Sequence, residues 1–356
     1  MILAAGYGTR LWPLTIDRAK PALPFMGRPL VGYVAEYLAR YGCGDIAVNL
    51  HHRPESVRAA LGDGSRFGVR LTYVEEPVIL GTSGALDNAR EFFGRETFVV
   101  VNGKIATDID LSAALRTHRE TGALATLILR ENAERERYST VNVSGGRVLG
   151  FGPSPQASDN AGDANSVSQK ESVPGSRKKG ESNLSGGDPA SGGARSDVPL
   201  MFTGIQILEP RIFDYIPRGV FSHSTVDVYP RAIERGEVIA AHVAEGYWYE
   251  LSTIRRYLDT SVALMRSQWR SVELGEGSRV ESGAEVSDAV LWESVVVESG
   301  ARVRGAVLGA GVRVGSGELF EDCAVVRREL VEGSERPAKA LEGEARGDNF
   351  VVKLPR

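Results

Sequence analysis

Cysteine is scarce in this sequence, with Cys43 and Cys323 the only two among 356 residues. Two cysteines cannot build a disulfide scaffold or a four-cysteine zinc site, and they fit the reducing cytosol. Apolar runs are short, and none approaches the roughly 18–20 residues of a membrane-spanning helix. The sequence does not start with a basic segment followed by an apolar one. We therefore expect no signal peptide and a cytoplasmic location.

Positive charge is not in excess either, because 42 Lys and Arg residues face 46 Asp and Glu residues, for a net charge of −4. This balance gives no electrostatic reason to expect a nucleic-acid or membrane partner. Hydrophobic residues make up 42% and charged residues 25%, which is a normal globular balance. Glycine is the residue in excess, with 41 copies.

Residues 1–152 alternate short apolar runs with helical patterns. Met1–Gly6 reads as a strand entering a glycine loop, and we expect that strand to begin a residue or two before Met1. Strands are also expected at Ile46–Leu50, Val69–Val74, Thr97–Val101 and Ala123–Leu129, and helices at Leu30–Tyr41 and Pro54–Leu61. This alternation favours a parallel sheet with helices on both faces.

Residues 153–199 break the pattern, because the segment has no aromatic residue and is dominated by Ser, Gly, Asp and Lys. Such a composition predicts a disordered insertion. Periodicity resumes with a strand at Met201–Leu208 and helices at Pro210–Ile216, Val226–Arg235 and Thr253–Arg266. The insertion therefore interrupts a single domain, expected at 1–270.

Residues 271–327 carry apolar side chains about every six positions, with glycines at regular offsets. They are Leu274, Val280, Val286 and Trp292, then Val297 and Val303, then Leu308, Val314 and Phe320. A hexapeptide period is typical of a parallel β-helix, although two one-residue slips leave an ordinary hairpin array as an alternative. The open end and exposed coils of such a β-helix make a homo-oligomer plausible. We expect the charged tail, 328–356, to be loose.

The first loop has the composition of a phosphate site. Gly6 and Gly8 follow a buried strand, so backbone N–H groups can approach a phosphate closely, and Arg10 adds further donors. Lys20, fixed beside Pro21 ten residues later, supplies a second phosphate-directed cation. A Gly-x-Gly loop alone is also compatible with a tight strand exit.

Taken together, the motifs resemble those of the sugar-nucleotide pyrophosphorylases, which are sugar-1-phosphate nucleotidyltransferases. The resemblance rests on Gly-Tyr-Gly-Thr-Arg-Leu-Trp-Pro-Leu-Thr at 6–15, Lys-Pro at 20–21, Asn-Leu-His-His at 49–52, Glu-Pro at 76–77, Leu-Gly-Thr-Ser-Gly-Ala-Leu at 80–86, Phe-Thr-Gly-Ile at 202–205, Thr-Val-Asp-Val-Tyr-Pro at 225–230 and Trp-Tyr-Glu-Leu-Ser-Thr at 248–253. With the terminal repeats, the most similar branch is the mannose-1-phosphate guanylyltransferases, which serve polysaccharide biosynthesis.

The resemblance implies a fold and a reaction. The fold is a Rossmann-like α/β mixed-sheet domain followed by a short left-handed parallel β-helix. In the reaction, a sugar 1-phosphate oxygen attacks the α-phosphorus of a nucleoside triphosphate and pyrophosphate leaves. GTP and mannose 1-phosphate, giving GDP-mannose, are the favoured substrates. A nucleotide-sugar-binding regulatory protein of the same fold is the alternative.

The resemblance also assigns roles to residues. The catalytic cations would be Arg10 and Lys20, to which we add Lys104 on its charge, although it departs from the family. Nucleotide binding would fall to Leu3, Ala5, Gly6, Gly8, Thr9, Glu76, Gly81 and Thr82, and sugar binding to Ser139, Thr203 and Gly204.

This sequence departs from the family at charged positions. Lys104 stands where the family has a magnesium-binding Asp, Glu250 replaces a second metal Asp, and the family's Glu-Lys-Pro is absent after Phe151. In one interpretation, Lys104 takes over part of the role of Mg²⁺, and Glu250 with Asp108 or Asp110 holds a single metal. In the other, catalysis is lost and the chain binds nucleotide sugars as a regulatory partner. Asp108 and Asp110 have a separate alternative as helix-capping or loop residues before Leu111. His51, His52 and the Ser222–Ser224 stretch read as strand-end and loop residues.

Overall fold

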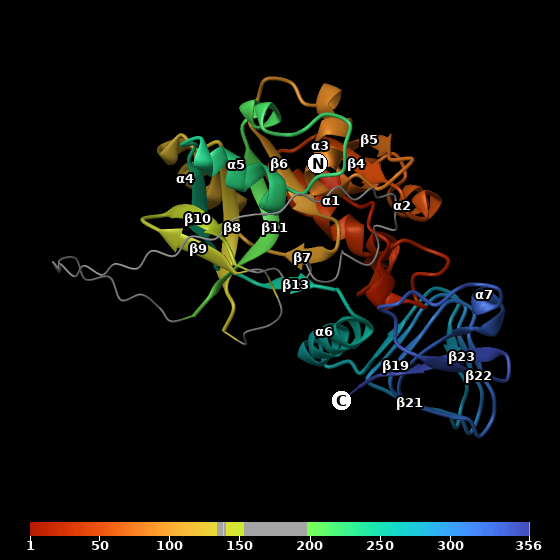
Figure 1. The fold of residues 1–356 in the computed structure, drawn as a ribbon. Helices are drawn as coiled ribbons and strands as arrows, with labels where there is room; N and C mark the ends of the chain where they lie inside the picture. The colour runs from red at the N-terminus through yellow and green to blue at the C-terminus, as the bar shows by residue number, and fades with distance from the viewer. Residues whose placement is uncertain (134–137, 139, 153–197, 356) are drawn as a thin grey trace, which may run out of the picture.

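The computed structural model describes residues 1–133, 138, 140–152 and 198–355. A nine-stranded sheet flanked by helices forms the larger part, and a stack of short strands forms the smaller part (Figure 1). The nine strands, in spatial order, are β5 (Arg70–Glu75), β4 (Asp45–Leu50), β1 (Ile2–Leu3), β6 (Phe98–Asn102), β11 (Leu200–Leu208), β8 (Ala125–Glu131), β12 (Ile239–Val243), β10 (Arg147–Phe151) and β9 (Val141–Ser144).

The first four strands of this order are parallel, as strand–helix alternation predicts, with Ile2 between Val48 and Val101. β11 runs antiparallel to β6 and β8, so the sheet is mixed. Alternate residues of the strands enter two separate cores, with Ile2 and Val48 in one and Met1 and Ala47 in the other. The covering helices are α1 (Leu30–Arg40), α2 (Pro54–Leu61), α3 (Gly81–Asn88), α4 (Leu111–Thr121) and α5 (Tyr229–Glu234).

Local sequence signals explain where several helices begin. Pro54 opens α2, a position where a proline loses no hydrogen bond. The Asp110 carboxylate accepts a hydrogen bond from Ser112 N at 2.9 Å and caps α4. Asp110 is therefore a capping residue, one of the two roles considered for it. Thr253 caps α6 (Ile254–Ser267) in the same way, through Arg256 N.

The helices expected at 210–216 and 226–235 are not regular α-helices over their whole length. The first is a 3₁₀ turn, η6 (Pro210–Asp214), and the second begins as a π-helical turn, η7 (Ser224–Val228), before α5. Most of the expected 153–199 insertion lies outside the described residues. Of its last two residues, Pro199 accepts a hydrogen bond from Asn132 N at 2.8 Å.

Residues from 272 onward form the expected parallel β-helix. Its strands are β14 (Val272–Leu274), β15 (Arg279–Val280), β16 (Glu285–Ser287), β17 (Ala289–Leu291), β18 (Val296–Val297), β19 (Arg302–Leu308), β20 (Arg313–Val314) and β21 (Leu319–Arg327). Each residue pairs with the one 17 positions on, as Val272 with Ala289 and Val290 with Val307. A coil of 17 residues takes steps of six, six and five, which accounts for the slips in the hexapeptide period. The left-handed sense of the helix stays a prediction.

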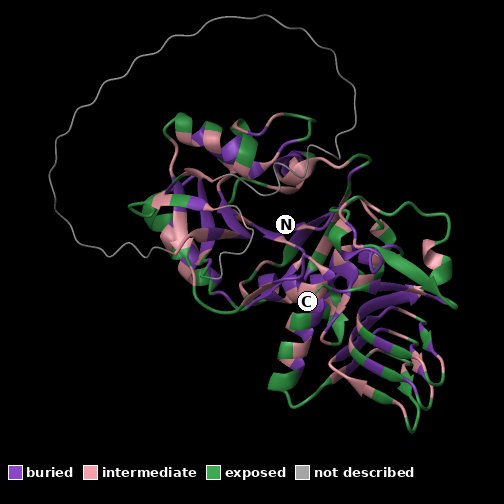
Figure 2. Cartoon of the chain, turned by 60° about the horizontal axis from the view of Figure 1, so that its bottom comes forward, coloured by how far each residue is buried: buried purple, intermediate pink, exposed green. Residues whose placement is uncertain are grey.

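The sequence-based prediction that Trp292 belongs to the inward-facing repeat is wrong. Leu291, not Trp292, stacks under Leu274 and enters the interior of the β-helix. Trp292 points the other way, into a core shared with α6, where its indole N–H donates to Tyr257 Oη at 3.0 Å. Buried residues therefore run through both the sheet and the coils (Figure 2). We propose a domain boundary near residue 270, between α6 and β14.

The expectation of a loose tail is wrong. Residues after β21 form α7 (Arg328–Val331) and an antiparallel hairpin, β22 (Gly343–Arg346) and β23 (Asn349–Lys353), whose second strand pairs with β21. Val351 and Val352 are buried because they alternate between the interior of the β-helix and the core shared with α6. The outer strand, β22, is exposed along its length and carries Glu344 and Arg346.

Candidate functional site

A cavity of about 380 Å³ opens at the carboxyl ends of β1, β4, β5 and β6. This edge, where connections leave a parallel sheet in opposite directions, is the usual ligand site of α/β folds. Eleven of the residues expected at the site line it, namely Leu3, Ala5, Gly6, Gly8, Thr9, Arg10, Lys20, Glu76, Gly81, Thr82 and Lys104. The fold thus brings together motifs from five separate parts of the chain.

The glycine loop follows β1 directly. Gly8 has φ +67°, and a Cβ there would lie 3.1 Å from Thr15 Cγ2 and 3.2 Å from Lys20 Cβ. Gly8 therefore lets the loop fold tightly against the stretch that carries Lys20. Gly6 faces open space, since a Cβ there would meet no atom within 4 Å, and Arg10 is exposed. Backbone and guanidinium donors are accordingly accessible to a phosphate.

Glu76 is a positioning residue more than a free ligand. The Asn49 amide donates to one carboxylate oxygen of Glu76 at 2.7 Å, and Leu80 N donates to the other at 2.9 Å. Asn49 also accepts from Ala4 N at 2.7 Å, so a single chain of bonds joins the β1 loop to the α3 loop. Burial raises the pKa of Glu76, although both hydrogen bonds oppose this shift.

Ser222–Ser224, read from the sequence as a plain loop, builds one wall of the cavity. A Cβ on Gly81, which has φ +75°, would lie 2.4 Å from Ser222 O. Ser224 N donates to Thr82 Oγ1 at 2.9 Å, and Thr82 N donates to His223 Nδ1 at 3.3 Å. His223 therefore lines the cavity together with Gly81. The sequence offered no signal for this role, because 141 residues separate His223 from Thr82.

Lys104 and Glu250 are joined by a short antiparallel ladder. In β7 (Ile105–Thr107) and β13 (Trp248–Glu250), Ile105 pairs with Glu250, and the Lys104 ammonium forms an ion pair with the Glu250 carboxylate. Burial disfavours ionisation of Glu250, but Lys104 and Lys20 outweigh it and lower its pKa to about 2. Glu250 is therefore a permanent anion that neutralises one of the two lysines.

Lys20 has a different electrostatic state. Part of the Lys20 surface faces the cavity. Desolvation is the main cause that lowers the pKa of its ammonium, to about 7, and repulsion from Lys104 adds to it. Attraction to Glu250 acts in the opposite direction. An anion entering the cavity would favour the charged form of Lys20. The site is therefore prepared to gain positive charge as a phosphate binds.

The resemblance implies Mg²⁺, and the residues present do not fit a protein-held divalent cation. The Glu250 carboxylate is already paired with Lys104. Asp108 lies beyond the opposite end of the β7–β13 ladder, where it accepts from Tyr247 N at 2.6 Å. Among the described residues, no group of three His, Cys, Asp or Glu side chains could hold a metal. Glu250 and Asp108 are thus not brought together as the joint ligands considered above.

Two of the three expected sugar-side residues, Thr203 and Gly204, lie on β11. The buried Thr203 hydroxyl donates to Ile128 O at 2.7 Å, so it holds a bulge in the sheet and is not available to a sugar. Gly204 has φ +81°, and a Cβ there would lie 2.1 Å from Asn102 Nδ2. Gly204 therefore leaves room for Asn102, which does line the cavity. Ser139 lies outside the described residues.

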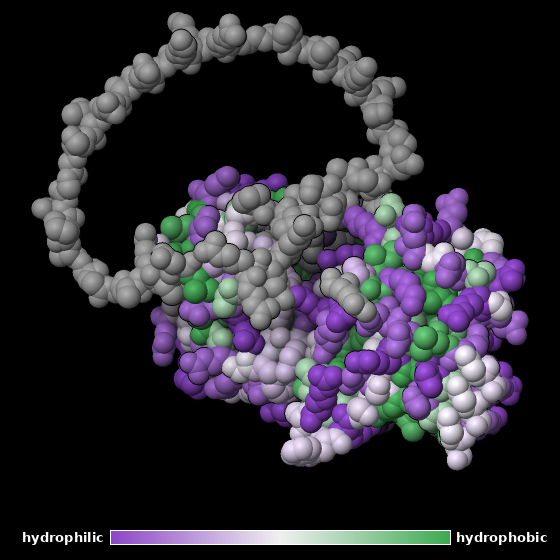
Figure 3. Space-filling model, turned by 90° about the horizontal axis from the view of Figure 1, so that it is seen from below, coloured by the Kyte–Doolittle hydropathy of each residue, from purple (hydrophilic) through white to green (hydrophobic). Residues whose placement is uncertain are grey.

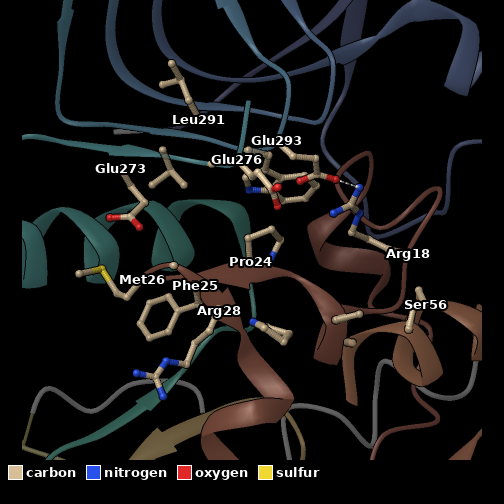
Figure 4. A pocket seen from close by; sticks show the side chains of 18 of the residues that line it. Arg18, Pro24, Phe25, Met26, Arg28, Ser56, Glu273, Glu276, Leu291 and Glu293 are labelled. Atoms are coloured by element: carbon tan, nitrogen blue, oxygen red, sulfur yellow. Dashed lines mark hydrogen bonds and ion pairs between the residues drawn. The ribbon is translucent and has the colours of Figure 1, made fainter. Parts of the chain in front are cut away.

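A second cavity, of about 630 Å³, lies between the N-terminal hairpin β2 (Pro24–Phe25) and β3 (Arg28–Pro29) and the first β-helix coils (Figure 4). Across it, Arg18 donates to Glu293 at 2.6 Å and lies 4.8 Å above the Trp292 ring. These contacts attach the β-helix to the larger domain. The phosphate loop does not line this cavity, so we assign the chemistry to the first one.

Comparison with known proteins identifies the family of this chain. The family model described as "Nucleotidyl transferase" matches residues 1–267, and "GlmU-like, C-terminal hexapeptide" matches residues 234–322. The chain belongs to the nucleotidyl transferase family. A family model covering this much of the chain, together with the curated relatives, identifies an enzyme of the sugar-1-phosphate nucleotidyltransferase type.

Two curated relatives extend over most of this nucleotidyl transferase. The UTP–glucose-1-phosphate uridylyltransferase of Synechocystis sp. is 28% identical over 312 residues, covering 83% of this chain and 71% of the relative. The mannose-1-phosphate guanylyltransferase of Mycobacterium tuberculosis is 28% identical over 296 residues, covering 82% and 72%. The two differ in both nucleotide and sugar.

Solved structures support the fold. A putative glucose-1-phosphate thymidylyltransferase from Bacillus anthracis has a TM-score of 0.56 at 22% identity, covering 74% of this chain and 94% of that one. HddC from Yersinia pseudotuberculosis, complexed with GMP-PN, has a TM-score of 0.55 at 19% identity, covering 74% and 97%. Within the described residues of this chain, no helix is long and apolar enough to cross a membrane.

Proposed function

We propose that this protein joins a nucleoside triphosphate to a sugar 1-phosphate at the cavity beside the glycine loop. A phosphate oxygen of the sugar 1-phosphate forms a bond to the α-phosphorus. The bond between the α- and β-phosphates breaks, and pyrophosphate leaves with the bonding electron pair. The observation that carries the proposal is the convergence of the 6–10 loop, Lys20 and Lys104 on one cavity at the switch point of the sheet.

The residues supply positioning and charge, which are the main requirements of this kind of transfer. Loop N–H groups and Arg10 bind the phosphates, and Lys20 gains its proton as they bind. Lys104 lines the same cavity and, through its ion pair, balances the charge of Glu250 that a metal would otherwise balance. Gly81 and Thr82 line the same cavity, where they would meet the base. Magnesium would reach this site only as a companion of the nucleotide.

GTP and mannose 1-phosphate are our proposed substrates, giving GDP-mannose for polysaccharide biosynthesis in the cytoplasm. The guanylyltransferase relative and the terminal β-helix favour this pair. The uridylyltransferase relative makes UTP and glucose 1-phosphate the pair to test beside it.

Pyrophosphate release tests the proposal. Purified protein is given GTP, UTP, dTTP, ATP or CTP with mannose 1-phosphate or glucose 1-phosphate, with Mg²⁺ or with EDTA. We expect release with one pair, at least tenfold slower in Arg10→Ala, because the variant loses a charge-assisted phosphate contact. Arg116→Ala, at an exposed position of α4, is the matched control and keeps the wild-type rate.

The second candidate function is a nucleotide-sugar-binding regulator of the same fold. The observation that favours it is the Lys104–Glu250 ion pair at the position where the family holds metal. Nucleotide-sugar binding by calorimetry, with no pyrophosphate release from any pair, would support the regulator and refute the enzyme.

Self-association through the β-helix is a separate proposal. Leu274 and Val280, in the first coil, are 49% and 37% exposed, whereas the equivalent residues of the next coil are buried. Hydrophilic and apolar residues are interspersed on the face seen in Figure 3. Sedimentation of the wild type and of a Leu274→Ser/Val280→Ser variant tests it, with a smaller oligomer expected for the variant.

A further inference from the structure

The cavity of about 380 Å³ beside the glycine loop is called the phosphate cavity below, after its proposed ligand. One of the residues that line it lies far outside the family motifs. Lys339 lines it beside Arg10, Lys20 and Lys104. Lys339 lies after both family matches, which end at residues 267 and 322. Neither family model therefore assigns it a role.

Apolar packing holds the segment that carries Lys339 against the N-terminal stretch. Ala340 is 6% exposed and forms a small core with Trp12 and Ile16, to which Leu330 and Val331 of α7 contribute. The Trp12 ring also meets the Phe350 ring edge-on, with centroids 5.5 Å apart. In Figure 1 the blue C-terminal segment accordingly lies beside the red N-terminal segment. Ala340, the residue that anchors the segment, directly follows Lys339, so the backbone of the lysine has little freedom.

Hydrogen bonds close the segment into a turn. Ala340 N donates to Pro337 O at 2.9 Å, and the Arg336 guanidinium donates to Ala340 O at 2.7 Å and to the Glu342 carboxylate at 3.3 Å. Lys339 lies inside this turn and is half-buried. The turn thus directs a lysine from the β-helix end of the chain into a cavity of the other domain.

The position of the anchor indicates which end of a nucleotide Lys339 would meet. Trp12 follows Arg10 of the phosphate loop after a single residue, whereas Glu76 and Gly81 come from the wall built after β5. Lys339 therefore enters on the phosphate side of the cavity. Lys339 lines this cavity together with Arg10 and Lys20.

We propose that Lys339 binds the phosphate chain of the nucleoside triphosphate, at the end that leaves as pyrophosphate. This inference rests on the proposed function. It makes the C-terminal segment a part of the active site, because the hairpin that follows β21 holds the lysine in place. A domain cut off after the β-helix coils would lack this contact.

Pyrophosphate binding by the full-length protein tests the proposal without depending on the choice of base. Calorimetry measures inorganic pyrophosphate and GTP or UTP with wild type, Lys339→Gln and Lys339→Arg. We expect pyrophosphate affinity to fall on the order of tenfold in Lys339→Gln, which is the loss of one charge-assisted contact. Lys339→Arg retains most of the affinity, because it keeps the charge.

Lys353→Gln is the matched control, since it removes the same charge from β23 in the same hairpin, where Lys353 donates to Glu321 O at 2.9 Å. The control binds pyrophosphate like the wild type, and all variants keep the wild-type circular dichroism and melting temperature. Equal pyrophosphate binding by wild type and Lys339→Gln would overturn this inference alone. A wild type that binds neither pyrophosphate nor any nucleotide would refute the proposed function, and this inference with it.

Discussion

The ammonium of Lys104 and the carboxylate of Glu250 are ion-paired across the β7–β13 ladder, at the edge of the phosphate cavity. Where the resemblance places two metal-binding carboxylates, this chain has one carboxylate and one cation. The pair fixes the charge of the site without a divalent ion. It also occupies the Glu250 carboxylate, which Lys104 and Lys20 together keep ionised, with an ammonium in place of a metal.

A single substitution should restore a metal requirement. In Lys104→Asp, two carboxylates replace the ion pair, and like charges at this distance repel unless a cation neutralises them. We expect wild-type affinity for the preferred nucleoside triphosphate to change less than about threefold between EDTA and Mg²⁺. Lys104→Asp should bind it more than about tenfold more tightly with Mg²⁺ than with EDTA. Lys104→Asn, which adds no charge, is the control, and equal Mg²⁺ dependence in all three proteins would contradict the prediction.

Lys20 should couple nucleotide binding to proton uptake. Its pKa is lowered to about 7, so it is largely neutral at pH 8 in the free protein and charged at pH 6. A bound triphosphate raises this pKa again, so binding takes up a proton at pH 8 and little at pH 6. Affinity therefore falls as the pH rises above 7.

Calorimetry in buffers of different ionisation enthalpy measures this uptake directly. Lys20→Arg should abolish the uptake at pH 8, because a guanidinium stays charged throughout this range. No difference between buffers at pH 8 for the wild type would count against the role of Lys20.

Gly204 should be intolerant of a side chain. With φ +81° and Asn102 Nδ2 2.1 Å from the position of a Cβ, Gly204→Ala combines backbone strain with a clash. We expect a loss of about 2–3 kcal/mol in the free energy of unfolding and a higher KM for the sugar 1-phosphate.

Gly236→Ala is the matched control, since Gly236 has φ +83° but nothing within 4 Å of a Cβ. It isolates the contribution of backbone strain to the loss in the free energy of unfolding, which we expect to be about 1 kcal/mol. Equal destabilisation of the two variants in urea unfolding would show that the contact with Asn102 contributes nothing.

Local sequence signals were sufficient for six of the nine strands of the main sheet and for the starts of α1 and α2, but not for β9, β10 and β12 or for α3 and α4. Pro54 and the Gly6–Arg10 stretch act through neighbours in the chain, so their patterns predict their structures. The 17-residue coil was also present in the sequence, as steps of six, six and five, but one slip led to Trp292 being assigned to the wrong face.

The rest depends on contacts between distant segments. His223 enters the site only because the η7 segment packs on the start of α3, and Lys339 only because Ala340 packs on Trp12. The tail is ordered by a pairing of β23 with β21 that its charged composition did not suggest. Thr203 lies within the family motif, yet its hydroxyl bonds to a neighbouring strand, which no pattern along the chain indicates.

The most direct test of nucleotidyl transfer is the reverse reaction. The protein is incubated with inorganic pyrophosphate and GDP-mannose, UDP-glucose or dTDP-glucose, and nucleoside triphosphate is quantified by chromatography, with Arg10→Ala alongside. We predict that wild type forms the triphosphate from one of these nucleotide sugars and that Arg10→Ala forms at least tenfold less. Binding of a nucleotide sugar with no triphosphate formed from any of them would contradict the proposed function.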